Sequence, residues 1–179
     1  MPYYFVREDK LVSAAQPPAG AQLLAQMSKS LHPPIITELH RSLHKWGELG
    51  KRPGLLTANR VWATPEGTLV IHFAEGESPL PLMHVGMAPD LASWLVLLDK
   101  WMETFVVVAR ARAVWTPTEL ISAMTFVNPL WLPQPLVLQP PLNWVRVVRA
   151  LAAAVADGPL RGQEHDTQSD QASDSRIAA

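Results

Sequence analysis

The chain has 179 residues, of which 48% are hydrophobic and 17% are charged, so it can bury a core and wholesale disorder is excluded. It contains no cysteine, which excludes disulfides, thiolate metal sites and a cysteine nucleophile. Its 15 basic and 16 acidic side chains give a net charge of -1, so no overall positive field favours nucleic acid as a partner.

Residues 1–30 are predicted to form a strand and a short helix that pack on the core. Tyr3 and Phe5 are apolar positions of a strand within residues 1–12. A proline-rich break precedes a helix over residues 21–30, with Leu23, Leu24 and Met27 on one side.

Residues 31–159 are predicted to form a single helical core domain with a hairpin over residues 60–73. After Pro33 and Pro34, apolar residues at helical spacing predict a helix that ends at Gly47 or Gly50. Residues 59–63 and 68–73 alternate as strands around a Thr-Pro-Glu-Gly turn. Residues 75–89 are predicted to be a loop, because prolines and glycines recur there.

A long apolar helix is predicted from about residue 91 to residue 110, with Asp90 as its cap. Five charged side chains interrupt the apolar run of residues 91–115, which favours a buried core helix over a membrane span. No signal peptide is evident at the N-terminus, so we expect a cytoplasmic protein without a membrane partner.

The last third of the chain alternates helices with a proline-rich stretch. Thr116 and Glu119 form a capping box for a helix that ends near Phe126. Residues 128–141 contain five prolines and are predicted to be extended chain lying on the core. Asn143 caps a helix over residues 144–156, and residues 160–179 are predicted to be a disordered polar tail. The predicted fold class is therefore α+β, mostly α.

No motif in the chain specifies an enzyme. His40 and His44 are four residues apart on a predicted helix, but no third ligand follows at a telling spacing, so they are weak metal candidates. No serine lies in a nucleophile turn, and Gly50-Lys51 lacks the rest of a phosphate-binding loop. We therefore expect no cofactor and no metal.

The order of elements from residue 35 to residue 98 resembles the C-terminal lobe of a protein kinase. Leu55-Leu-Thr-Ala-Asn59 resembles the end of the catalytic loop, and residues 61–71 resemble the small hairpin that follows it. His72-Phe73-Ala74 stands at the position of the Asp-Phe-Gly motif. Asp90-Leu-Ala-Ser93 resembles the opening of the large buried helix, whose Asp braces the catalytic loop in that family. The resemblance implies a truncated kinase C-lobe.

The departures from the kinase pattern imply a chain without phosphoryl-transfer activity. Gly54 stands where the family has its catalytic-base Asp, and His72 stands where it has the metal-binding Asp. Phosphoryl transfer depends on carboxylate-held magnesium and on a residue that orients the nucleophile, and Asn59 alone supplies neither. Only about 30 residues precede the matching region, so we expect no N-lobe in this sequence, and whether the chain is a fragment of a larger kinase-like gene stays open.

These observations favour a pseudokinase-like scaffold that binds another protein, through Pro129, Trp131, Pro133 and Leu136 of the proline-rich stretch. A small enzyme or metal-binding protein that uses His40, His44 or His72 remains an alternative. A non-catalytic nucleotide binder that uses Asn59 and Arg60 is another. The enzyme hypothesis predicts that polar groups converge in one cleft, whereas the scaffold hypothesis predicts an exposed apolar patch. The partner's identity and the oligomeric state stay open.

Overall fold

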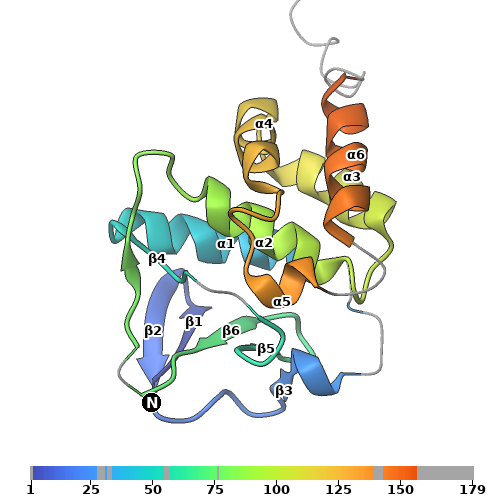
Figure 1. The fold of residues 1–179 in the computed structure, drawn as a ribbon. Helices are drawn as coiled ribbons and strands as arrows, with labels where there is room; N and C mark the ends of the chain where they lie inside the picture. The colour runs from blue at the N-terminus through green and yellow to red at the C-terminus, as the bar shows by residue number, and fades with distance from the viewer. Residues whose placement is uncertain are drawn as a thin grey trace, which may run out of the picture.

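The computed structural model describes residues 2–27, 31, 34–54, 57–75, 77–138 and 143–156. Within these residues the chain is α+β, with six α-helices packed over a five-stranded antiparallel sheet and a second, two-stranded sheet (Figure 1). No helix in this described part is long and apolar enough to cross a membrane. The tail predicted for residues 160–179 lies outside the described residues.

The N-terminal segment contributes more β structure than the sequence predicts. It forms a hairpin of β1 (Tyr3–Arg7) and β2 (Lys10–Ala14), in place of the single strand expected for residues 1–12. Glu8 and Asp9 both have positive φ, as a two-residue hairpin turn requires. The helix predicted for residues 21–30 is also wrong in its described part, which consists of β3 (Gln22–Leu23) and a 3-10 turn (Leu24–Gln26). Pairing of β3 with β5 and full burial of Leu24 override the helical pattern there.

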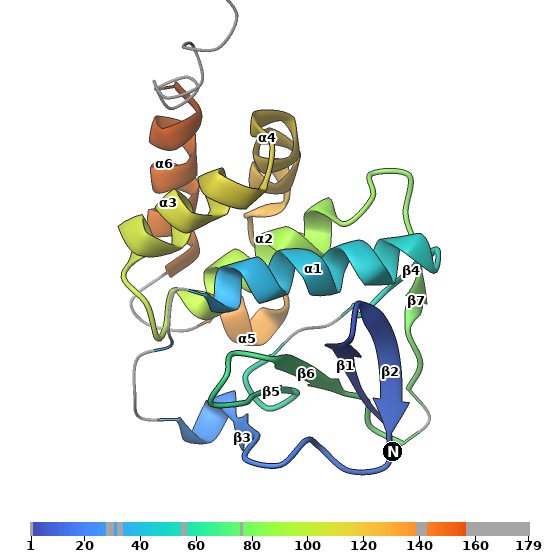
Figure 2. The same ribbon diagram turned by 180° about the vertical axis from the view of Figure 1, so that it is seen from behind.

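The five-stranded sheet has the order β2-β1-β6-β5-β3. Its centre is the predicted hairpin, formed by β5 (Val61–Ala63) and β6 (Leu69–His72). Helix α1 (Ile35–Glu48) lies across the sheet and packs against α3 (Thr104–Val114) on its other side (Figure 2). One face of α1 is buried, because its apolar residues recur at helical spacing, as predicted.

Helix α2 (Ala88–Leu98) is the centre of the molecule, and all of its residues are buried. Helices α3 (Thr104–Val114), α4 (Pro117–Phe126) and α6 (Asn143–Ala156) surround it. The single helix predicted for residues 91–110 is therefore two helices, separated at residues 99–103. The Asp99 carboxylate accepts hydrogen bonds from Thr104 and Arg146, which fixes the bend between them.

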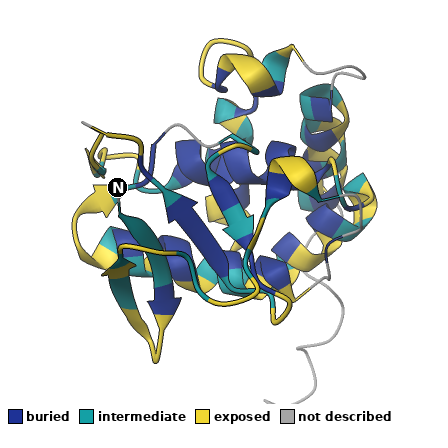
Figure 3. Cartoon of the chain, turned by 90° about the horizontal axis from the view of Figure 1, so that it is seen from below, coloured by how far each residue is buried: buried dark blue, intermediate teal, exposed yellow. Residues whose placement is uncertain are grey.

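The remaining elements lie at the edges of this core. Strands β4 (Lys51–Arg52) and β7 (Leu80–Pro81) form the second sheet, so the predicted loop of residues 75–89 includes a short strand. The Thr116 capping box is present as predicted. The proline-rich stretch is not fully extended, because it contains the short helix α5 (Gln134–Val137). Figure 3 shows the buried residues gathered in the sheet and the helices packed on it, with exposed residues at the turns.

Candidate functional site

A buried carboxylate joins the start of α2 to the segment after β4. Oδ1 of Asp90 accepts a hydrogen bond of 3.0 Å from the backbone N–H of Gly54. Oδ2 of Asp90 lies 3.2 Å from Nε of Arg52, and the two groups form an ion pair whose alignment is too poor for a hydrogen bond. The Asp90 side chain has no solvent exposure. Asp90 is therefore not the N-terminal cap that the sequence predicts. It lies within the first turn of α2, and its carboxylate contacts Arg52 and Gly54, which lie outside the helix.

Burial raises the pKa of Asp90 to about 6, while the Arg52 guanidinium and the Gly54 N–H act in the opposite direction. The carboxylate is consequently ionised at neutral pH. Both of its oxygens face protein groups and neither faces solvent. This arrangement fixes the backbone at Gly54, and it does not leave a group free to act on a substrate.

The open end of the β5–β6 hairpin carries the residues proposed for a nucleotide. Asn59 is exposed, but the Arg60 guanidinium is paired with the Glu77 carboxylate. The second Glu77 oxygen accepts a 3.0 Å hydrogen bond from the N–H of Ala74, and this bond and Arg60 lower the pKa of Glu77. The positive charge of Arg60 is thus already balanced by Glu77.

His72 stands at the end of β6, stacked on Tyr3 with 4.5 Å between the ring centroids. Burial lowers its pKa, and the positive charges of the N-terminus and of Arg60 act in the same direction. The imidazole is therefore neutral at pH 7. His72 lies in a β-strand and stacks on an aromatic ring, and this packing role explains its presence there.

The two histidines of α1 lie one turn apart, as their spacing predicts. Their rings are parallel at a centroid distance of 6.4 Å. His44 contacts Glu48, with 3.1 Å between Nε2 and Oε1, while the His40 ring packs edge-on against Trp115. Nowhere in the described ranges do three or more His, Cys, Asp or Glu side chains gather as a metal would require.

The four residues predicted to bind a partner fall into two groups. Pro129 and Trp131 are exposed, and Trp131 has 52% of its surface in solvent. Pro133 and Leu136 are buried, and Leu136 lies in the hydrophobic core. This corrects the sequence-based set, because the two buried residues anchor the stretch to the core and are not available to a partner. Leu130, which no sequence pattern distinguishes from its apolar neighbours, is 92% exposed.

We call residues 126–131 the apolar turn. Asn128 holds its shape: Oδ1 accepts from the N–H of Leu130 at 3.0 Å, and Nδ2 donates to the carbonyl of Thr125 at 2.8 Å. The Trp131 ring meets the Phe126 ring edge-on at 5.0 Å. Leu130 and Trp131 are therefore presented to solvent by an ordered turn. The Asn-Pro pair at residues 128–129 is the sequence signal that predicts a turn here.

Comparison with family models, with curated proteins and with solved structures found no match for this chain.

Proposed function

We propose that this chain is a non-catalytic protein-interaction module, pseudokinase-like, and that the apolar turn is its contact surface. The observation that carries the proposal is the exposure of Leu130 and Trp131, at 92% and 52%, on a turn that internal hydrogen bonds keep ordered. Neighbouring apolar side chains held in water cost free energy, and a partner that covers them recovers it.

Covering these two side chains would supply a sizeable share of the free energy of binding. Full burial of an apolar side chain of this size contributes roughly 1.5–3 kcal/mol. Trp is among the residue types that dominate binding energy at protein interfaces. The Asn128 hydrogen bonds also order the turn before binding, which lowers the entropic cost of association.

Several contacts support the kinase-like part of the proposal. Asp90, at the start of a completely buried helix, holds the backbone at Gly54, as the resemblance implies for the Asp that braces the catalytic loop. Strands β4 and β7 pair on either side of the segment that resembles the catalytic loop and hairpin. Gly54 and His72 replace the two carboxylates on which phosphoryl transfer depends, so the proposed module has no kinase activity.

A matched set of variants tests this function by affinity capture from cells that naturally make the protein. The baits are the wild-type chain, the double variant Leu130→Ser/Trp131→Ser, and Leu49→Ser. Leu49 is also an exposed leucine, but it follows α1 and lies outside the apolar turn. We expect a specific protein on wild type and on Leu49→Ser that is lost from the double variant. Equal recovery on all three baits, with circular dichroism showing all three folded, would contradict the proposal.

A further inference from the structure

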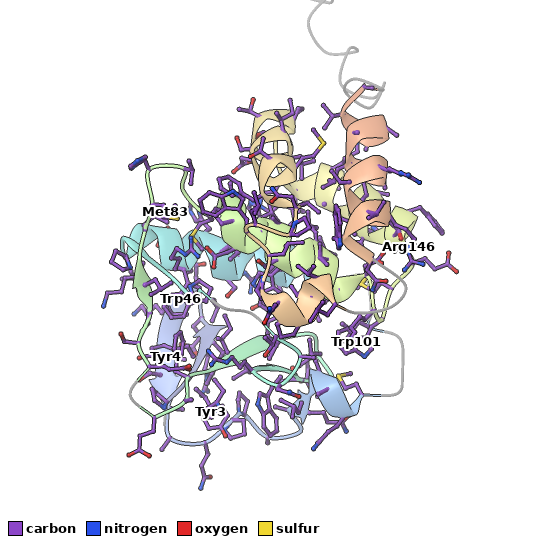
Figure 4. The ribbon with its side chains drawn as sticks, in the orientation of Figure 1. Tyr3, Tyr4, Trp46, Met83, Trp101 and Arg146 are labelled. Carbon is purple, nitrogen blue, oxygen red and sulfur yellow. The ribbon has the colours of Figure 1, made fainter. Side chains whose placement is uncertain are left out.

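The bend between α2 and α3 and the first turns of α6 line an open cavity of about 930 Å³. None of the residues of the apolar turn lines it. Its apolar lining includes Trp101, Phe105 and Ala150, and Phe105 is 66% exposed, so the cavity opens to solvent. Figure 4 shows Trp101 and Arg146, which both line the cavity, on the same side of the molecule. The cavity has the size of a small-molecule site.

Three basic side chains line this apolar cavity. Arg146 and Arg149 are three residues apart on α6 and so share one face of that helix. Nζ of Lys100 lies 5.5 Å from the centroid of the Trp101 ring. Burial lowers the pKa of Lys100, and an anion bound nearby would act in the opposite direction.

The acidic side chains of the lining leave part of this positive charge unbalanced. Asp99 is fully buried and is already used, because its carboxylate accepts from the Thr104 hydroxyl and from Nη2 of Arg146 at 2.9 Å. The other acid, Glu103, is exposed. Within the described part of the chain, neither Lys100 nor Arg149 forms an ion pair with a carboxylate.

We propose that this cavity binds a small amphipathic anion, with an apolar body and a single carboxylate or phosphate group. The apolar body would cover the rings of Trp101 and Phe105, which gives most of the binding energy. The anionic group would pair with Arg149 and Lys100, while the buried Asp99 keeps Arg146 oriented beside them. This site is separate from the proposed partner surface and does not depend on it.

The probe for the test is 8-anilinonaphthalene-1-sulfonate, an apolar aromatic anion that fluoresces when it binds. Its neutral counterpart N-phenyl-1-naphthylamine has a similar body without the charge. The variant is Arg149→Glu, and the matched control is Arg110→Glu, which makes the same charge change at an exposed α3 residue outside the cavity. Circular dichroism confirms that both variants are folded.

We expect one saturable site for the anionic probe, about fivefold or more weaker in Arg149→Glu and unchanged in Arg110→Glu, as the loss of one charge-assisted contact implies. Binding of the neutral probe should be equal in the two variants. Equal weakening of the anionic probe by both substitutions would overturn the proposal, and so would the absence of saturable binding.

Competition then distinguishes the two sources of negative charge. Decanoate and decyl phosphate share one apolar chain and differ only in their anionic group. Displacement of the probe from the wild-type chain by either compound supports the site, and the more effective compound identifies the preferred group. Failure of both to displace it would overturn the proposal.

Discussion

The buried carboxylate of Asp90 should make the stability of the fold depend on pH. Its pKa is raised from 3.8 to about 6, chiefly by burial. One pKa unit corresponds to about 1.4 kcal/mol, so ionisation of this group costs the folded state about 3 kcal/mol relative to the unfolded state. Substitution Asp90→Asn removes the charge but keeps a side-chain oxygen that can accept from the N–H of Gly54.

The sign of the effect follows from the two pKa values. Between pH 3.8 and about 6 the folded chain holds a proton on Asp90 that the unfolded chain has lost. The contribution of this group to stability is therefore greatest below pH 3.8 and falls as the pH rises toward 6, above which it is constant.

Urea unfolding followed by circular dichroism measures this dependence in the wild type and in Asp90→Asn. Subtraction of the two profiles cancels the other titrating groups, because both chains share them. We expect the free energy of unfolding of the wild type, relative to Asp90→Asn, to fall by about 3 kcal/mol from acidic to neutral pH. Parallel profiles for the two proteins would refute the reasoning.

Three further predictions concern the stability of the fold and the binding of ATP. Thr116→Ala removes the capping box of α4 and should lower the free energy of unfolding by about 1 kcal/mol in urea titrations, whereas no change would show the cap to be dispensable. Gly54→Ala should cost about 1–2 kcal/mol, since φ is +77° there and an added Cβ would lie 2.9 Å from Cδ1 of Leu80; an unchanged urea midpoint would contradict this. In the proposed pseudokinase-like module, Gly54 and His72 stand where a kinase has its carboxylates, so ATP with magnesium should leave the melting temperature unchanged in a thermal-shift assay; a clear rise would instead favour a nucleotide binder.

The parts of the fold that local signals specify could be predicted from the sequence. The periodic apolar face of α1, the Pro-Glu-Gly turn of the hairpin and the Thr116 capping box each act within a few residues. The break between α2 and α3 could not be predicted from the sequence, because apolar residues continue on both sides of it. The side chains that fix the bend, Asp99 and Arg146, are 47 residues apart. The β3 strand cannot be predicted locally for a similar reason, since its pairing with β5 is a tertiary contact.

The candidate sites also divide into features that local sequence signals predict and features that depend on tertiary contacts. The sequence identified an apolar proline-rich stretch, but composition does not tell which of its side chains face the core. Leu136 and Pro133 are buried, whereas Leu130 is the most exposed large hydrophobic residue in the part of the chain that the structure describes. The cavity beside Arg149 has no sequence signal, because it forms only where the bend after α2 packs against α6.

The most direct test of the proposed function is site-specific photo-crosslinking in cells that make the protein. A benzophenone side chain placed at Leu130 lies on the proposed contact surface, and the same group at Leu49 reports a similarly exposed position outside it. The account predicts one discrete cross-linked partner from position 130 that is absent from position 49. The same products at both positions, or none at position 130, would contradict it.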